Sequence, residues 1–250
     1  MKTEINSEIV KEYGLNAGAS VVGIAASKDF GLAPDGFKPS DNLKGCLSVI
    51  VLGATFPRGV LNNTALYTES RNAMLTTMTG MAKEVAKRIK ADGYKTKAIS
   101  ASGGKWVDGD GRKEQFGHIS LKHAAELAGL GIIGRNYLLT NSQYGNLLWF
   151  SAVLTDADLI PDKKASYKIC DDCSKCVETC PSGALDETAL FGKKGCSNFF
   201  TMVDRKFEIK CFLCRTVCPY VLGIRRINAR KDFDLWRIKK PDALEIPPFT

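Results

Sequence analysis

The spacing of apolar residues predicts alternating helices and strands over the first 156 residues. Apolar positions recur at helical intervals over residues 6–18, and a stripe of methionines and aliphatic residues repeats this spacing over residues 74–89, where we expect core packing. Short runs rich in valine and isoleucine predict strands. These runs cover residues 20–26, 46–56, 94–102 and 146–156. Helices that alternate with strands are typical of α/β and α+β folds, so we predict such a core for residues 1–160.

Two glycine-rich segments lie between the last predicted strands. Residues 103–117 are polar, which predicts a loop. The sequence GLGIIG, Gly129–Gly134, fits the G-x-G-x-x-G pattern of dinucleotide sites, and Asp156 follows at a suitable distance. That pattern should follow a strand and open a helix, whereas here it follows residues 119–128, which predict a helix. We therefore interpret it as a helix end that turns into a closely packed loop or approaches a cofactor.

The chain becomes irregular and rich in cysteine after residue 160. Of its nine cysteines, Cys46 stands alone at the start of an apolar strand, where we expect a buried core thiol. The next four follow the spacing C-x2-C-x2-C-x3-C-P of bacterial ferredoxins. The last four are one displaced cysteine and a C-x2-C-x3-C-P run. These eight are Cys170, Cys173, Cys176, Cys180, Cys196, Cys211, Cys214 and Cys218.

This spacing predicts two [4Fe–4S] clusters. In the ferredoxin run the cysteine before proline serves the other cluster, so the two runs should exchange their last ligands. The predicted ligands of the first cluster are Cys170, Cys173, Cys176 and Cys218. Those of the second are Cys180, Cys196, Cys211 and Cys214. Structural zinc, which also binds C-x2-C pairs, is the alternative.

The predicted clusters change the interpretation of the formal net charge of +8. A [4Fe–4S] cluster with four thiolates carries about −2 in its oxidised state, so the clusters would offset part of the basic excess. Residues 225–240 are also basic, which predicts a solvated tail or a docking segment for an acidic protein or RNA. No apolar run approaches the roughly 18 residues of a membrane helix, and the first residues lack a signal peptide pattern. We expect a soluble, cytoplasmic protein with no membrane partner.

The sequence AGLGIIGRNYLLTNSQYG, residues 128–145, followed by VLTD and the interleaved cysteines, resembles epoxyqueuosine reductase and its relatives, the reductive dehalogenases. Residues 8–27 and the SVIVLG strand also resemble that family, and the resemblance spans roughly residues 5–225. It implies a nitroreductase-like core at residues 1–160 that binds cobalamin, with FMN as a less favoured cofactor. A ferredoxin-like domain would follow at residues 161–225, and a basic tail at residues 226–250.

The resemblance also implies an electron path and a set of cofactor contacts. Electrons would pass from an external donor, such as ferredoxin or flavodoxin, through both clusters to cobalamin, which would reduce a small substrate. The residues implied to line the corrinoid are Gly129, Gly131, Gly134, Asn136, Leu138 and Gly145.

The chain departs from that family in two respects. It ends soon after Cys218, without the helical-repeat extension that helps the family to hold tRNA, so we expect no tRNA substrate. The segment before the glycine motif lacks the family's proton-donating aspartate. His118 titrates near neutrality and is our candidate proton donor, with Glu114 and Tyr67 as alternatives, whereas His123 is expected to pack within its helix.

Two other functions stay open on the sequence. The chain could be an electron-transfer or reductive-activation partner of a corrinoid or other redox enzyme, for which a basic docking surface would suit an acidic redox partner. It could also be a flavin-dependent reductase, since nitroreductase-like cores also hold flavin.

Overall fold

The computed structural model describes residues 2–108, 113–185, 196, 200–203, 206–209 and 211–221. Its centre is a four-stranded sheet in which every neighbouring pair is antiparallel. The strand order is β1 (Val21–Ala26), β2 (Ser48–Thr55), β8 (Leu148–Thr155) and β3 (Thr96–Ile99). All four strands lie within the runs predicted from the sequence. The mixed α/β fold class is therefore confirmed, whereas the strand directions had not been predicted.

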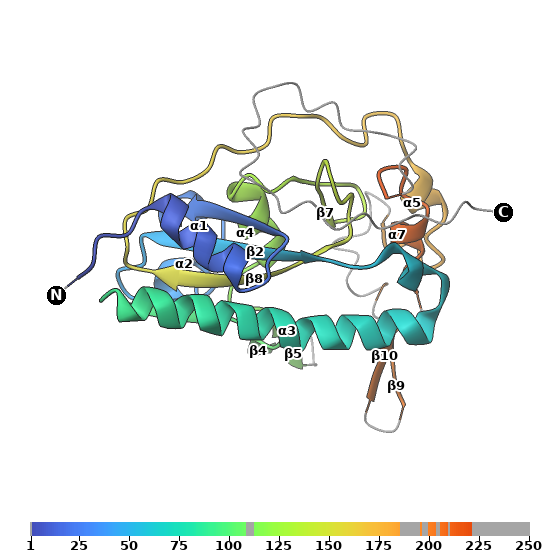
Figure 1. Ribbon diagram of the computed structural model, residues 1–250. Helices are drawn as coiled ribbons and strands as arrows, with labels where there is room; N and C mark the ends of the chain where they lie inside the picture. The colour runs from blue at the N-terminus through green and yellow to red at the C-terminus, as the bar shows by residue number, and fades with distance from the viewer. Residues whose placement is uncertain are drawn as a thin grey trace.

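Two helices cover one face of the sheet (Figure 1). They are α1 (Ser7–Asn16) and α3 (Thr64–Ala91). Asparagine caps both helices: the side-chain oxygen of Asn6 accepts from the Ile9 backbone N–H, and that of Asn63 accepts from Leu66. The predicted methionine stripe packs here, with Met78 fully buried. It is therefore core rather than a cofactor surface.

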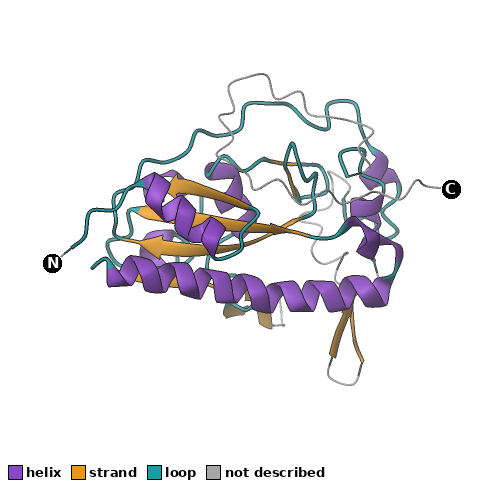
Figure 2. Cartoon of the chain, viewed as in Figure 1, coloured by secondary structure: helices purple, strands orange, loops and turns teal. Residues whose placement is uncertain are grey.

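The opposite face of the sheet is covered by α4 (Leu121–Leu127), which lies behind the strands in Figure 2. Ala124, Ala125 and Ala128 are buried against the sheet because their small side chains allow a close approach. Cys46 is buried in this same cluster, as predicted, and its thiol donates to the Ser48 carbonyl at 3.4 Å.

The segment at residues 103–117, predicted as a loop, contains two antiparallel strands. Its strands are β4 (Lys105–Asp108) and β5 (Lys113–Phe116). The Phe116 and Phe37 rings make a T-shaped contact with centroids 6.1 Å apart, so a contact distant in sequence stabilises the strand pair. A smaller pair, β6 (Ile132–Ile133) and β7 (Leu139–Thr140), follows α4.

Short elements complete the described chain. Three of them connect the core: η1 (Ser27–Phe30), α2 (Pro39–Asn42) and η2 (Arg58–Asn62). The cysteine-rich part contributes α5 (Lys175–Glu178), β9 (Phe200–Val203), β10 (Lys206–Ile209) and α7 (Leu213–Thr216). Figure 1 places α5 and α7 together beyond the end of the sheet, near the start of α3. The predicted tail, residues 226–250, lies outside the described residues.

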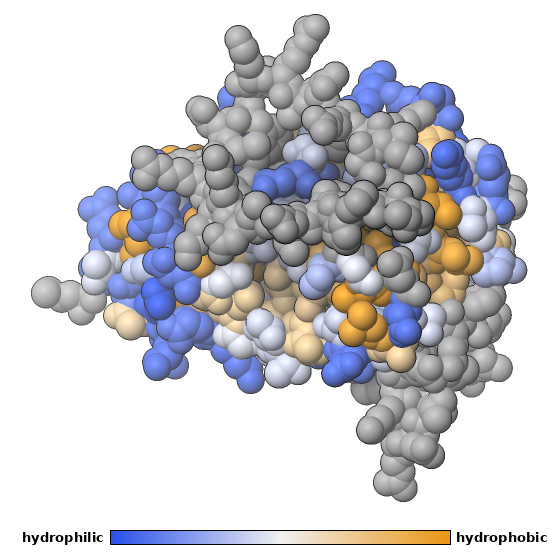
Figure 3. Space-filling view, turned by 45° about the vertical axis from the view of Figure 1, so that its right-hand side comes forward, coloured by the Kyte–Doolittle hydropathy of each residue, from blue (hydrophilic) through white to orange (hydrophobic). Residues whose placement is uncertain are grey.

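The surface of the described part is mixed. In Figure 3, hydrophilic residues dominate the left part of the visible face, and hydrophobic residues gather mainly to the right of centre. Leu66 on α3 and Leu213 on α7 are among the exposed large hydrophobic side chains. No helix of the described residues is long and apolar enough to cross a membrane.

Candidate functional site

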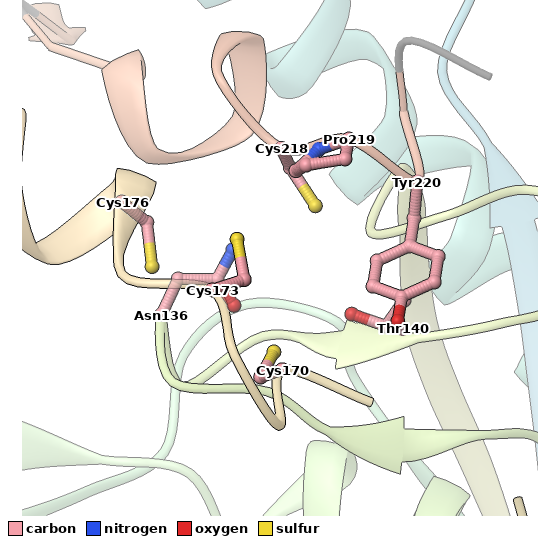
Figure 4. Close-up of a pocket in the computed structure, with 8 residues that line it drawn as sticks. All are labelled: Asn136, Thr140, Cys170, Cys173, Cys176, Cys218, Pro219 and Tyr220. Atoms are coloured by element: carbon pink, nitrogen blue, oxygen red, sulfur yellow. The ribbon is translucent and has the colours of Figure 1, made fainter. Parts of the chain in front are cut away.

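Four of the predicted ligands line one small cavity. Cys170, Cys173, Cys176 and Cys218 surround it together with Asn136, Thr140, Pro219 and Tyr220. Figure 4 shows the four sulfur atoms directed toward a shared space, with the Tyr220 ring beside it. The structure thus brings together two cysteine segments that are 42 residues apart, counted from Cys176 to Cys218.

Local backbone geometry directs these thiols toward the cavity. Cys170 has a φ of +64°, which non-glycine residues rarely adopt, and this turn begins the first cysteine segment. Cys176 lies on α5, and Cys218 follows the last turn of α7. Both Cys176 and Cys218 are 9% exposed, so this side of the cavity is shielded from water.

The glycine loop of the core forms another wall of the cavity. A methyl group at Gly134 would lie 3.4 Å from the Cys170 sulfur, so the loop passes directly against that thiol. Asn136 donates from Nδ2 to the Cys214 carbonyl at 3.2 Å, and its Oδ1 accepts from the Leu138 backbone. One asparagine therefore joins the core, the cavity and the second cysteine segment.

The other glycines implied to line a corrinoid face protein backbone instead. A Cβ at Gly129 would lie 2.2 Å from the Lys163 carbonyl, and one at Gly131 would lie 2.4 Å from the Thr140 carbonyl. Gly145 has a φ of +56° and packs against Tyr220 and Val221. Leu138 is half-buried. The role of these six residues toward cobalamin stays a prediction.

The glycine motif itself is a helix end, as the sequence indicated. The Gly129 and Leu130 backbone N–H groups donate to the carbonyls of Glu126 and Ala125, and Gly129 has a φ of +74°. This is the geometry of a glycine that terminates a helix. The motif contains β6 and leads into the turn before β7 rather than opening a helix, so it lacks the geometry of a dinucleotide site.

Electrostatic interactions join seven of the eight thiols in two groups. Burial, with smaller contributions from the neighbouring Cys170, Cys173 and Cys218, raises the pKa of Cys176 to about 11. Although Cys196 is exposed overall, partial desolvation raises the pKa of its thiol, and so do Cys211 and Cys180. These are the two sets of neighbours that the sequence spacing assigns to two clusters.

Cys214 lies where the two groups meet. Burial, with smaller contributions from Cys196, Cys211 and Cys176, raises the pKa of its thiol to about 11, and the charge of Arg215 opposes this rise. Thiols held together in a dry site resist ionisation unless a cationic centre compensates their charge. The donor set therefore fits an iron–sulfur cluster, whose several iron atoms bind thiolates spread around it. No three His, Cys, Asp or Glu side chains of the described residues converge on a single metal ion.

His118 is not one of the residues that line this cavity. Its Nδ1 is buried without a hydrogen-bond partner, and its carbonyl accepts from Asn42 Nδ2 at 3.0 Å. Burial lowers the pKa of the ring, and the charges of Lys97 and Lys105 lower it further. The ring is therefore mainly neutral at pH 7, and its catalytic role stays a prediction.

The other candidate proton donors differ in position. Tyr67 is 3% exposed and stacks between Phe56 and Phe212, with ring centroids 5.2 and 4.6 Å away. The Glu114 side chain lies outside the described part. His123 is exposed and its Nδ1 lies 2.6 Å from the Ser120 hydroxyl, so the expectation that it packs was wrong. The helical pattern placed His123 on α4 but did not show which face it occupies.

Sequence reasoning missed several residues at this site. Thr140 and Tyr220 line the cavity, and Arg215 is buried behind it. The sequence could have pointed only to Arg215 and Tyr220, because they lie within or directly after the C-x3-C-P run. Thr140 enters the site through the fold alone.

A larger hollow of roughly 500 Å³ lies at the opposite end of β2. Lys28, Lys38, Cys46 and Asp158 are among its lining residues, and none of the eight clustered cysteines is.

Comparisons with known proteins support the resemblance seen in the sequence. No family model matches the chain. The curated epoxyqueuosine reductase of Bacillus subtilis (strain 168) is 30% identical over 137 residues, which are 50% of this chain and 33% of that protein. The enzyme of the same name from Gloeobacter violaceus is 31% identical over 158 residues, 58% of this chain and 45% of the relative. The chain thus matches less than half the length of these curated relatives.

The chain is also similar in fold to solved structures. A selenomethionine-labelled epoxyqueuosine reductase superposes with a TM-score of 0.61 at 20% identity, covering 94% of this chain and 68% of that one. An epoxyqueuosine reductase with an epoxyqueuosine-modified tRNA stem loop gives 0.58 at 18% identity, covering 86% and 65%. A catabolic reductive dehalogenase gives 0.61 at 17% identity, covering 86% and 31%. The chain is therefore similar in sequence to epoxyqueuosine reductases, and it shares its fold with them and with reductive dehalogenases.

Proposed function

We propose that this chain is an iron–sulfur reductase of the epoxyqueuosine reductase and reductive dehalogenase type. The observation that carries the proposal is the cavity in which four thiols from two distant segments meet the Gly134–Asn136 loop of the core. A cluster held there would touch the α/β core directly. The similarity to curated reductases supports the same conclusion.

The eight clustered cysteines would bind two iron–sulfur clusters. Cys170, Cys173, Cys176 and Cys218 would hold one [4Fe–4S] cluster. Cys180, Cys196, Cys211 and Cys214 would hold the other. Such clusters supply one-electron transfer. The buried Cys176 and Cys218, with Pro219 and Tyr220 beside them, would keep water from the first cluster, while Asn136 would fix its distance from the second.

The proposed architecture follows the sequence prediction. Residues 1–160 would be a nitroreductase-like core, and residues 161–225 a ferredoxin-like cluster domain. The core would carry the electron acceptor, for which cobalamin is the first candidate and FMN the second. An external donor such as ferredoxin or flavodoxin would reduce the clusters.

The substrate proposal has to be wider than the sequence suggested. The expectation that excluded tRNA depended on where the chain ends, and that argument does not hold for a chain that matches only part of its relatives. A structural neighbour is bound to a modified tRNA stem loop. We therefore propose either a small molecule or a modified nucleoside within tRNA as the substrate.

Anaerobic cluster reconstitution tests the proposal. The wild-type protein should bind about eight iron atoms per chain and matching sulfide, as two [4Fe–4S] clusters require. Cys173→Ser should lose roughly half of this iron, whereas Cys46→Ser, which alters a core thiol outside both groups, should keep it. If the wild-type protein instead binds zinc and no sulfide, the cysteines form a structural zinc site and the proposal is wrong.

A second measurement addresses the acceptor. The loaded protein is mixed with hydroxocobalamin, freed of excess, and its visible spectrum is recorded before and after reduction. Retained corrinoid absorbance that changes on reduction would support cobalamin. A spectrum with iron–sulfur absorbance alone would require the same trial with FMN.

The packing of the glycine loop favours a second candidate function. Because Gly129, Gly131 and Gly145 face backbone rather than open space, the chain could deliver electrons to a partner without binding a cofactor of its own. This electron-transfer role predicts intact clusters, no retained corrinoid or flavin, and electron transfer to an added redox partner.

A further inference from the structure

Arg215 is a buried cation inside the cysteine-rich segment. It lies on α7 between Cys214 and Cys218 and is only 5% exposed. Its guanidinium donates from Nη1 to the Asn146 carbonyl. The same group lies over the rings of Phe56 and Trp149, at 5.9 and 5.8 Å from their centroids.

These contacts hold the charge in place without neutralising it. Arg215 takes part in no ion pair with any carboxylate of the described residues. A guanidinium taken out of water is costly unless an anionic group compensates it. Carbonyl and aromatic contacts offset only part of this desolvation free energy, so an anion is expected close to Arg215.

The adjacent thiols can supply this anion. Cys214 directly precedes Arg215, and the charge of Arg215 acts on its sulfur. A cluster bound by four thiolates carries about −2 when oxidised, and one more negative charge after reduction. No carboxylate of the described residues pairs with Arg215, and the proposed clusters would bring an anion that compensates its charge.

We propose that Arg215 is a positioning residue that serves as the fixed counter-cation of the cluster held through Cys214 and raises its reduction potential. This inference rests on the proposed function. When one electron enters that cluster from an external low-potential donor, the oxidised cluster gains one negative charge and no bond is broken. A nearby cation stabilises the more negative product, so reduction becomes more favourable.

Burial is what makes this cation effective. Phe56 and Trp149 exclude water from the guanidinium, and the Asn146 carbonyl prevents it from turning outward. Arg135 offers a natural contrast in the same region. It is exposed, and its Nη1 lies 3.4 Å from the Cys173 carbonyl, so water and salt should screen its charge.

A redox titration of the reconstituted protein, followed by EPR and with dithionite as reductant, tests the inference. In Arg215→Gln the equilibrium constant for one-electron reduction of one cluster should fall about tenfold, which corresponds to about 59 mV. Arg215→Lys, which keeps the charge, should stay close to the wild type. Arg135→Gln removes an exposed charge and should leave both potentials unchanged.

The outcomes separate this inference from the proposed function. A wild-type protein that binds no iron would overturn the proposed function. Iron-loaded Arg215→Gln with wild-type potentials would overturn only the role of Arg215. If Arg215→Gln binds no iron, Arg215→Lys decides: a loaded lysine variant with a wild-type potential supports the counter-cation, and an unloaded one shows that shape rather than charge is needed.

Discussion

At the scale of single residues, close backbone approach explains the glycine motif. Gly131 lies so near the Thr140 carbonyl that any side chain would collide with it. This contact fixes the position of the loop that reaches Gly134 and the Cys170 sulfur. The cavity wall thus depends on the missing side chain at Gly131.

Gly131→Ala should therefore destabilise the protein by about 1–3 kcal/mol, because the backbone must move to admit a methyl group. Urea unfolding measures the change. Gly31→Ala is the matched control, since no atom lies within 4 Å of its added methyl and its φ is −56°. Equal stability of the two variants would contradict the packing role.

His118 gives a second residue-scale prediction. Burial and two lysines lower the pKa of this ring in the folded state, so the unfolded chain binds more protons near its ordinary pKa of about 6.5. The stability that the neutral ring contributes is complete above that pH and is lost as the pH falls through it.

Between pH 7.5 and pH 6, the melting temperature of the cluster-loaded wild type should consequently fall by more than that of His118→Gln. The glutamine side chain of the variant cannot gain a charge. Thermal unfolding at both pH values measures this. If turnover of an identified substrate falls in His118→Gln while iron content is unchanged, His118 is also the proton donor. An identical pH response of both proteins would show that the ring titrates normally.

At the scale of elements, one ion pair ties the connection after β8 to α1. Lys11 on α1 is 5% exposed and pairs with Asp162 at 2.5 Å. Asp162 also accepts from the Ile24 backbone at 2.8 Å. This connection leads from the sheet to the first cysteine segment, so its anchoring helps to direct Cys170 toward the cavity.

Asp162→Ala should cost about 3 kcal/mol, because it removes the carboxylate that pairs with the buried Lys11 ammonium and accepts from the Ile24 backbone. Chemical unfolding gives the value. Asp35→Ala removes a carboxylate of the same kind from the exposed pair with Lys38 and should change stability little. A small effect of Asp162→Ala would mean that Lys11 reaches water once its partner is removed.

At the scale of the whole molecule, a stack of aromatic rings joins the cysteine-rich segment to the core. Phe56 comes from the end of β2, Tyr67 from the first turns of α3, and Phe212 from beside Cys211. Cys218 is buried in this same cluster. The position of the proposed clusters relative to the sheet therefore depends on hydrophobic contacts between parts of the chain that are far apart in sequence.

Tyr67→Ala should weaken this contact by about 3 kcal/mol and speed the loss of iron to a chelator. Tyr67→Phe keeps the stack and should retain iron like the wild type. Iron release under anaerobic conditions measures both. A phenylalanine variant with full iron but no turnover would instead identify the Tyr67 hydroxyl as the proton donor.

The sequence alone determined the features that depend on local spacing. The four strands of the central sheet, the main helices and the end of α4 at Gly129 follow from periodicity and glycine chemistry. Each of these needs only residues that are neighbours along the chain. The pairing of β4 with β5 was missed because the contact of Phe116 with Phe37 bridges 79 residues.

Only the tertiary structure decided which distant groups meet. It set the antiparallel strand order, placed Cys218 beside Cys176, turned Gly131 against a carbonyl and buried Arg215 between two rings. It also left His118 outside the cysteine cavity, although the sequence favoured it as a catalytic group. The physical reason is that burial, desolvation and close packing arise between segments remote in sequence, and no local pattern records them.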